Sequence, residues 1–256
     1  MEQLTQFREK LNSKDGVLGL FMKTEDPAFV EIAGYNHFDY VILDMEHGPG
    51  NYRQMQNLVR AAQISGTLPI IRVTKADETL ISRALDIGAA GVQIPQIDSA
   101  GQARLSVMAA KYSPEGNRGV CRFVRAAHYS ATDKYSYLSD ANNSLVILQL
   151  EGVEILEDLE SILDVPGIDI IFIGPYDLSA SLGLPGQVEH PKVLEVMKQI
   201  ICRAKEKGIA IGTFTDSIEA ARFWRTLGVK YLAFSTDVGV FTETCKKAVE
   251  SFHQEP

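Results

Sequence analysis

The chain has 256 residues, with 25 Lys and Arg against 33 Asp and Glu, a formal net charge of −8 at pH 7. This acidic balance excludes functions that need a basic face, such as binding nucleic acid or an anionic membrane surface. It still permits a small anionic substrate, which needs only one local positive site.

The cysteines and the apolar runs indicate where such a chain would work. Cys121, Cys202 and Cys245 are far apart and odd in number, so we expect no disulfide framework or zinc cluster, and we expect a reducing, cytoplasmic compartment. The first 14 residues lack an apolar core, so we expect no signal peptide. The apolar runs are strand-sized, so we expect no membrane span.

Eight short apolar runs follow one another along the chain. They are continuous rather than alternating, which is typical of parallel strands that are covered on both faces. The predicted strands are Val17–Phe21, Tyr40–Leu43, Pro69–Val73, Gly91–Ile94, Leu145–Leu150, Ile168–Ile173, Ile209–Phe214 and Tyr231–Phe234.

Amphipathic helical patterns fill the spaces between these runs. Asp26-Pro27 combines an N-cap with a proline in the first helical turn. From Tyr52, apolar side chains recur with a period of about 3.6 residues until Gly66. Asp77 can cap a helix that stops at Gly88. Further helices are predicted at about 99–111, 155–163, 193–207 and 217–227.

This alternation predicts a single (β/α)8 (TIM) barrel domain over residues 1–256. A doubly wound open sheet is the alternative, because a strand count alone does not show closure. The one irregular stretch, at about 112–143, contains Pro, Gly, four Tyr and several Arg and is too long for a simple connection. We expect it to lie over an active site or to form a subunit contact.

Two acidic residues follow neighbouring strands, at the end where a barrel builds its active site. Glu151 follows the fifth run and Asp177 the sixth, and neighbouring strands lie about 4.8 Å apart. Carboxylates that close repel each other unless one is protonated or a cation lies between them. They predict a Mg²⁺ or Mn²⁺ site whose open positions a 2-oxo acid could chelate. The alternative is a helix N-cap or a surface ion pair.

A guanidinium and an imidazole stand at neighbouring strand ends. Arg72 could offer planar donors to a carboxylate or a developing enolate oxygen, but a structural ion pair with Asp44 or Glu46 is equally compatible with the sequence. His47 lies in an acidic turn and could move a proton near neutral pH, although a lone histidine is more often structural. Schiff-base chemistry would need a desolvated lysine, and the only candidate, Lys75, has polar flanks.

An ordered set of motifs covers the chain from about residue 16 to residue 241 and resembles the class II pyruvate aldolases. This family includes the 4-hydroxy-2-oxoheptanedioate and 2-dehydro-3-deoxygalactarate aldolases. The motifs are Leu43-Asp44-x-Glu46-His47-Gly48-Pro49, Leu85-Asp86-Ile87-Gly88-Ala89, Ile94-Pro95, Arg118-Gly119, Gln149-x-Glu151 and Gly174-Pro175-x-Asp177-Leu178-Ser179-x-Ser181-Leu182-Gly183.

The resemblance implies a barrel, a divalent metal ion (Mg²⁺ or Mn²⁺, with Co²⁺ possible), reversible cleavage of a 4-hydroxy-2-oxo acid to pyruvate and an aldehyde, and a homo-oligomer, in this family a hexamer. It also implies roles for particular residues. Glu151 and Asp177 would bind the metal, His47 would transfer protons, and Arg72 would hold the pyruvoyl oxygen and stabilise the enolate. Gln149 and the backbone at Tyr176 and Asp177 would contact the substrate. Asp86 would raise the basicity of the histidine.

Some features depart from the family pattern or from the barrel geometry. Asp86 ends a predicted helix, which places it at the far end of a barrel, where it also opposes the helix dipole. Met45 and Tyr176 stand where relatives often carry small residues, so we expect them to affect which aldehyde the site accepts. Ala127-His128-Tyr129 replaces a tryptophan-containing version of the long loop.

Two other functions remain open from the sequence. A coenzyme A-dependent carbon–carbon lyase of the citrate-lyase-like branch would need a basic groove, for which Arg118, Arg122 and Arg125 are the only cluster. A non-enzymatic, ligand-binding barrel is the other alternative.

Overall fold

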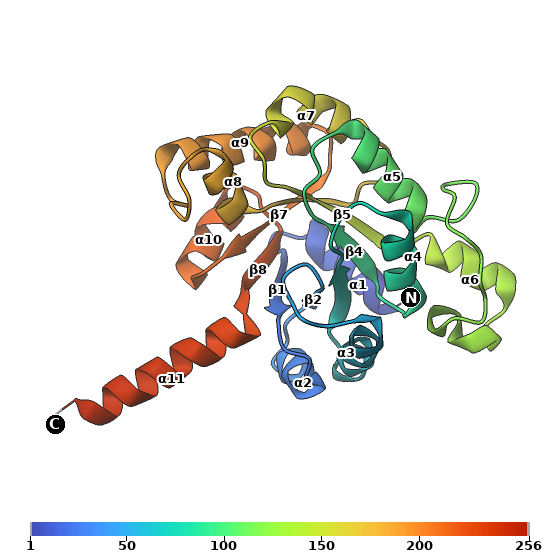
Figure 1. Cartoon of the computed structure of the whole chain (residues 1–256), viewed down its shortest axis with the longest axis horizontal. Helices are drawn as coiled ribbons and strands as arrows, with labels where there is room; N and C mark the ends of the chain where they lie inside the picture. Colours follow the sequence, from blue (N-terminus) through green and yellow to red (C-terminus); the bar gives the residue numbers. More distant parts are fainter. Residues whose placement is uncertain (1, 255–256) are drawn as a thin grey trace.

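Eight parallel strands close into one barrel in which each strand pairs with its neighbours in sequence and β1 pairs with β8 (Figure 1). The computed structural model describes residues 2–254. Closure confirms the (β/α)8 barrel and removes the open-sheet alternative, and every predicted strand is present. The strands are β1 Val17–Met22, β2 Tyr40–Asp44, β3 Leu68–Arg72, β4 Gly91–Ile94, β5 Leu145–Leu150, β6 Ile170–Ile173, β7 Ala210–Thr215 and β8 Tyr231–Thr236.

Helices surround the barrel and begin at the capping residues that the sequence indicates. Asn51 and Gln54 form a reciprocal capping box at the start of α3, and Gly66 ends that helix at a φ of 81°, which favours glycine. The helices flanking the strands are α2 Pro27–Tyr35, α3 Tyr52–Ser65, α4 Glu78–Asp86, α5 Ala100–Ala110, α7 Ile155–Leu163, α8 Pro175–Ser181, α9 Pro191–Glu206 and α10 Ile218–Thr226.

Two apolar layers hold this arrangement together. The larger one lies between the strands and the outer helices. The smaller one fills the barrel, where inward side chains such as Phe21, Tyr40, Phe172 and Tyr231 pack together. Such filling makes the barrel interior a packed core rather than a pore.

An N-terminal helix that the sequence analysis did not predict, α1 (Glu2–Asn12), completes this inner layer. Phe7 and Leu11 are its buried residues, and the Phe7 ring meets Tyr40 and Tyr231 edge-on at 5.9 and 6.4 Å. α1 therefore packs on the inner layer at the end of the barrel where the strands begin. We therefore look for the chemistry at the opposite end of the barrel, its mouth, where the strands terminate.

The irregular stretch at 112–143 folds as a small unit with its own core of Tyr112, Ala127 and Tyr137. It contains a 3-10 helix, η1 (Arg125–Ser130), and α6 (Lys134–Ala141). It follows α5 and precedes β5, so it belongs to the end of the barrel where the strands begin. The stretch therefore does not lie over the mouth of its own barrel, and a subunit contact remains a prediction.

The last helix, α11 (Asp237–His253), leaves the barrel and extends into solvent (Figure 1). Its first residue, Asp237, is buried and accepts hydrogen bonds from the backbone N–H groups of Lys23 and Thr24. The helix is therefore anchored at its base to the end of β1. Among residues 2–254, no helix has both the length and the hydropathy that a bilayer crossing requires.

Candidate active site

Polar side chains from neighbouring strands form a buried row inside the mouth. The strand register pairs Asp44 of β2 with Arg72 of β3, and Arg72 with Gln93 of β4. Because side chains alternate along a strand, all three point into the barrel. Gln149 of β5 joins them, since its Oε1 accepts a hydrogen bond from Gln93 Nε2 at 2.6 Å. All four are buried, so the row is a fixed part of the core.

Arg72 is held by carboxylates on two sides. Its Nε and Nη2 donate to the two oxygens of Asp44, each at 2.8 Å, and its Nη1 lies 2.8 Å from Glu46 Oε2. The ion pairs that the sequence left open are therefore formed with both acids. Bidentate contact fixes the plane of the guanidinium, while each Nη atom keeps a second N–H that can reach a substrate oxygen.

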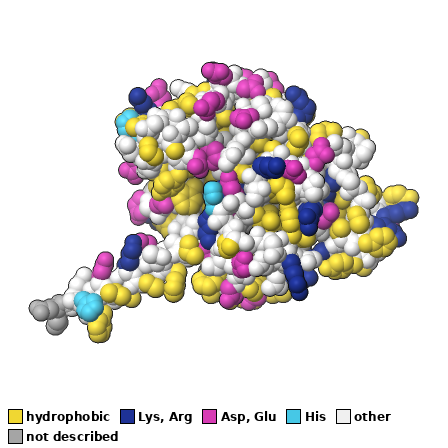
Figure 2. All heavy atoms as spheres, in the orientation of Figure 1, with side chains coloured by type: hydrophobic (Ala, Val, Ile, Leu, Met, Phe, Trp, Pro, Cys, Tyr) yellow, Lys and Arg dark blue, Asp and Glu magenta, His cyan; other side chains and the backbone are white. Residues whose placement is uncertain are grey.

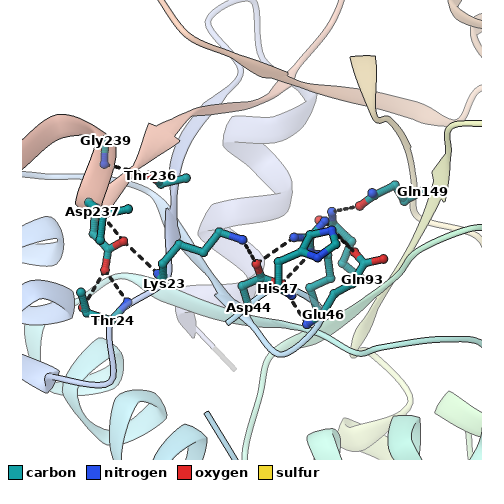
Figure 3. A network of polar contacts seen from close by, with 12 residues as sticks. Lys23, Thr24, Asp44, Glu46, His47, Gln93, Gln149, Thr236, Asp237 and Gly239 are labelled. Atoms are coloured by element: carbon teal, nitrogen blue, oxygen red, sulfur yellow. Dashed lines mark hydrogen bonds and ion pairs between the residues drawn. The ribbon is translucent and has the colours of Figure 1, made fainter. Parts of the chain in front are cut away.

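Asp44 also binds Lys23, whose side chain reaches it from the end of β1 (Figure 3). Burial opposes ionisation of Asp44, but hydrogen bonds and charge from Arg72, and then from Lys23, outweigh burial and lower the pKa of Asp44 to about 2. The two cations and the carboxylates of Asp44 and Glu46 balance one another on this side of the mouth.

The opposite side of the mouth is short of positive charge. Glu151 is 6% exposed and accepts a hydrogen bond from the backbone N–H of Gln96 at 2.8 Å and another from Gln149. Burial raises the pKa of Glu151 to about 7, with the hydrogen bond from Gln149 opposing and the charges of Glu46 and Asp177 adding to the rise. The structure thus brings the two predicted ligands, Glu151 and Asp177, into one electrostatic cluster.

The residues of this cluster fit a hard divalent cation. Its donors are carboxylate oxygens, the ligands that Mg²⁺ and Mn²⁺ prefer. Glu46 Oε2 is paired with Arg72 Nη1 at 2.8 Å, although it forms no hydrogen bond among the described residues. A cation beside Glu151 would favour its ionised form against the burial, and the smaller effect of nearby negative charges, that raise its pKa. Residues 2–254 contain no cluster of three or more His, Cys, Asp or Glu suited to a metal. Two carboxylates would therefore be completed by water and substrate.

Gly174, at the end of β6, leaves space for this arrangement. A Cβ atom at this position would lie 2.6 Å from Glu151 Oε2 and 3.4 Å from Gln149 Nε2. Any larger residue would displace the carboxylate. Asp177 follows in the first turn of α8, which explains why the Gly-Pro-x-Asp sequence suits this strand end.

His47 and Tyr176 stand at the rim, where a substrate could reach them. The His47 side chain is 61% exposed, with Nε2 3.9 Å from Glu46 Oε2. Figure 3 shows its ring next to Glu46 and the buried row. Tyr176, beside Asp177, donates a hydrogen bond from its hydroxyl to Asp216 Oδ2 at 2.6 Å. This hydrogen bond, with burial adding to it, raises the pKa of Tyr176 to about 12.

Asp86 is the one predicted site residue that the structure does not bring to the mouth. It ends α4, the helix that returns from the mouth to the end where β4 begins, and its Oδ1 lies 2.6 Å from Arg118 Nη2. Asp86 therefore does not adjoin His47 within one chain, and its effect on the basicity of the histidine stays a prediction. The ion pair offsets the unfavourable position of an acid at a helix C-terminus.

Lys23 and Gln93 belong to the cluster but were missed from the sequence. Gln93 is a polar residue inside a strand-sized apolar run, and Lys23 directly follows the first strand. Both features were visible, but each is common in barrels and neither names a partner. Lys75, the lysine considered for Schiff-base chemistry, is exposed in the loop after β3.

Comparison with known proteins agrees with this geometry. Residues 17–244 match the HpcH/HpaI aldolase/citrate lyase family. The 2-keto-3-deoxy-L-rhamnonate aldolase of Salmonella typhi is 36% identical over 248 residues, which cover 96% of this chain and 92% of that protein.

Solved structures of similar proteins share the fold over their whole length. An HpcH/HpaI aldolase/citrate lyase family protein from Burkholderia cenocepacia superposes with a TM-score of 0.92 at 30% identity, covering 98% of this chain and 99% of the other. An HpcH/HpaI aldolase from Desulfitobacterium hafniense gives 0.89 at 33% identity, with 97% of each chain covered.

Proposed function

Because the chain belongs to the HpcH/HpaI aldolase/citrate lyase family, we propose that its mouth binds a divalent metal ion and a 4-hydroxy-2-oxo acid. The chain is a carbon–carbon lyase of the aldolase type, cleaving its substrate to pyruvate and an aldehyde. The observation that carries the proposal is geometric: Asp44 holds the Arg72 guanidinium by two hydrogen bonds, and the same strand ends carry the buried carboxylate of Glu151, which Gln149 and the backbone of Gln96 hold in place.

Glu151 and Asp177 would hold the ion, which is Mg²⁺ or Mn²⁺, or alternatively Co²⁺. When bound, such an ion supplies Lewis-acid polarisation of the 2-oxo group. Gln149, fixed between Gln93 and Glu151, would orient the substrate, together with the backbone at Tyr176 and Asp177.

The protein's own groups would then divide the proton and charge transfers between them. His47, at the exposed rim, would take the proton from the 4-hydroxyl group. Cleavage of the C3–C4 bond leaves negative charge on the pyruvate enolate. The remaining N–H groups of Arg72 would stabilise that charge, and they need no reorganisation because Asp44 and Glu46 already fix the guanidinium.

The proposal is tested by pyruvate release from a panel of 4-hydroxy-2-oxo acids, with Mg²⁺ or Mn²⁺ and then with EDTA. We expect activity to disappear with EDTA, to return with metal, and to fall by at least about a hundredfold in Glu151→Gln. Glu154→Gln, an exposed acid three residues away, is the matched control. Activity that is indifferent to EDTA would contradict the metal mechanism. Borohydride trapping of Lys23 or Lys75 would then be the next test.

We also propose a homo-oligomer, with the hexamer of the family as the expected form. The outer faces of β1, β8 and α10 border a cavity of about 340 Å³ lined by Leu18, Ala221 and Leu232, where the helix that follows the last strand would pack in a complete barrel. α11 does not fill this place but extends into solvent (Figure 1). Figure 2 shows apolar side chains along one side of this helix.

The exposed apolar face of α11 supports contact with a second copy. Val238, Phe241, Val249 and Phe252 are 44–83% exposed, and their spacing places them on one face of the helix. We expect light scattering to give a mass well above 28.2 kDa and Phe252→Glu to lower it, with Glu250→Gln as the control. A wild-type monomer would contradict this part of the proposal.

The alternative functions receive less support. Arg118 is bound to Asp86, and Arg125 to Ile87 and Gln63, so two of the three arginines in the suggested coenzyme A groove are already bound within the chain. A non-enzymatic barrel would not need the cluster of ionisable groups at the mouth, so we favour an enzyme. Because Cys121, Cys202 and Cys245 are free and exposed, we retain a cytoplasmic location as a proposal.

A further inference from the structure

A row of aromatic rings leads away from Arg72 across the floor of the mouth. The Arg72 guanidinium lies 4.9 Å from the centre of the Phe21 ring. Phe21 meets Phe214 with ring centres 5.8 Å apart, and Phe214 meets Tyr176 at 6.0 Å, both nearly edge to face. The row therefore runs from β3 past β1 to β7 and ends at the first turn of α8.

The far end of this row is polar. Asp216 directly follows the last residue of β7 and precedes α10. Its Oδ2 accepts the hydroxyl hydrogen of Tyr176 at 2.6 Å. A carboxylate accepts several hydrogen bonds, so Asp216 keeps capacity for another donor. Tyr176 is 44% exposed and Asp216 is also exposed, so both are accessible to a bound molecule.

The charges around the mouth differ from one side to the other. Toward β1 and β2, the cations Lys23 and Arg72 are matched by Asp44 and Glu46. Figure 3 shows the side chain of Lys23 reaching Asp44. At the β7 rim, Asp216 has a neutral phenol as its partner.

More negative charge lies on the outer side of Asp216. A cavity of about 480 Å³ there is lined by Asp216, Glu189 and Glu219, and none of its described lining residues is a lysine or an arginine. The β7 rim is therefore acidic.

The bound substrate must cross this rim if it follows the aromatic row. In the proposed function the pyruvoyl half lies between Arg72 and Glu151, so the aldehyde half would extend away from both. Lys23 and Asp44 fill the β1–β2 side with a closed ion pair (Figure 3). Phe214, which is partly exposed above the buried Phe21, offers the C–H groups of an aldehyde an apolar surface that ends in the hydrogen-bonding groups of Tyr176 and Asp216.

We propose that Tyr176 and Asp216 form the subsite for the tail of the aldehyde and select neutral, hydroxylated aldehydes over those that carry a carboxylate. This inference rests on the proposed aldolase function. A hydroxyl group on the tail donates to Asp216, or accepts from Tyr176, and forms a hydrogen bond that an unsubstituted aldehyde lacks. A carboxylate on the tail meets the charge of Asp216 with no cation to offset it.

The test compares kcat/KM for the addition of pyruvate to glyceraldehyde, propanal and succinic semialdehyde. Glyceraldehyde should be preferred over succinic semialdehyde by the wild type. Asp216→Asn should raise the relative value for succinic semialdehyde on the order of tenfold, because like-charge repulsion is removed. Tyr176→Phe should lower kcat/KM for glyceraldehyde, relative to kcat/KM for propanal, by about fivefold. This factor corresponds to the loss of one hydrogen bond. Glu9→Gln removes an exposed carboxylate from α1, at the opposite end of the barrel, and should leave both ratios unchanged.

Exchange of the methyl protons of pyruvate with deuterated water separates this inference from the proposed function, because enolisation needs no aldehyde. We expect exchange in the wild type and in both rim variants. If both rim variants exchange the methyl protons but show the same kcat/KM ratios between aldehydes as the wild type, the proposed subsite is wrong and the aldolase function stands. Exchange lost in Asp216→Asn or Tyr176→Phe also overturns the subsite, since these residues would then act on the pyruvate half. A wild type that shows no exchange with Mg²⁺, Mn²⁺ or Co²⁺ overturns both.

Discussion

The buried ion pairs of Asp44 should be measurable as a pH dependence of stability. Arg72 and Lys23 lower the pKa of Asp44 from 3.8 to about 2 in the folded chain, even though burial opposes this. One pKa unit corresponds to about 1.4 kcal/mol, so the ionised carboxylate contributes about 2 kcal/mol to the free energy of unfolding. The side chain is buried, so solvent screening reduces this figure little.

The sign follows from the direction of the shift. Because the folded-state pKa is lowered, this contribution is fully present above the unfolded pKa and is lost as the pH falls through the folded value. Asp44→Asn removes the titrating group and also leaves Lys23 and Arg72 without a carboxylate. We therefore expect the variant to be less stable by at least about 2 kcal/mol at pH 7. The difference from the wild type should shrink by about 2 kcal/mol between pH 4 and pH 2.

The assay is urea unfolding followed by circular dichroism at pH values from 7 to 2, at one protein concentration and one ionic strength. Glu219→Gln, which removes an exposed carboxylate from α10, is the control for a change in net charge. A difference between wild type and Asp44→Asn that stays constant from pH 5 to pH 2 would refute the reasoning, because the ion pairs would then contribute no pH-dependent stability.

Three further substitutions test separate parts of the structure. Gly174→Ala would place a Cβ atom 2.6 Å from Glu151 Oε2, so kcat should fall by at least about tenfold with little change in Tm; unchanged kcat would contradict the close approach. Arg72→Lys loses the bidentate contact with Asp44, so kcat/KM should fall by about 10²–10³; a smaller loss would remove the guanidinium from the mechanism. Phe7→Ala should lower the free energy of unfolding by about 3–5 kcal/mol, measured in urea; a loss below about 1 kcal/mol would mean that α1 does not complete the inner core.

Local sequence pattern was sufficient to predict the strands of the barrel and to indicate most of the candidate site residues. Parallel strands covered on both faces require continuous apolar runs, so all eight strands could be predicted, with ends within two residues of those in the structure. The change from apolar to ionisable residues at a strand end can also be read from neighbouring residues in the sequence. It identified His47, Arg72, Glu151 and Asp177 before any contact between them was known.

Contacts between distant segments could not be predicted in the same way. Closure depends on β1 meeting β8, and the row of Asp44, Arg72 and Gln93 depends on strand register. Neither has a local sequence signal, because both are set by packing across the whole barrel. The α1 helix was missed for the same reason, since its few apolar residues acquire their role only against the open end of the barrel.

The sequence by itself determined the fold class and the chemical groups at the mouth, because hydrophobic periodicity and strand ends are properties of neighbouring residues. Only the tertiary structure decided which of these groups form ion pairs or hydrogen bonds with one another. It placed Lys23 on Asp44, separated Asp86 from His47, and joined Tyr176 to Asp216. These outcomes depend on distances between segments that are far apart in the chain, and electrostatic and hydrogen-bond energies fall steeply with such distances.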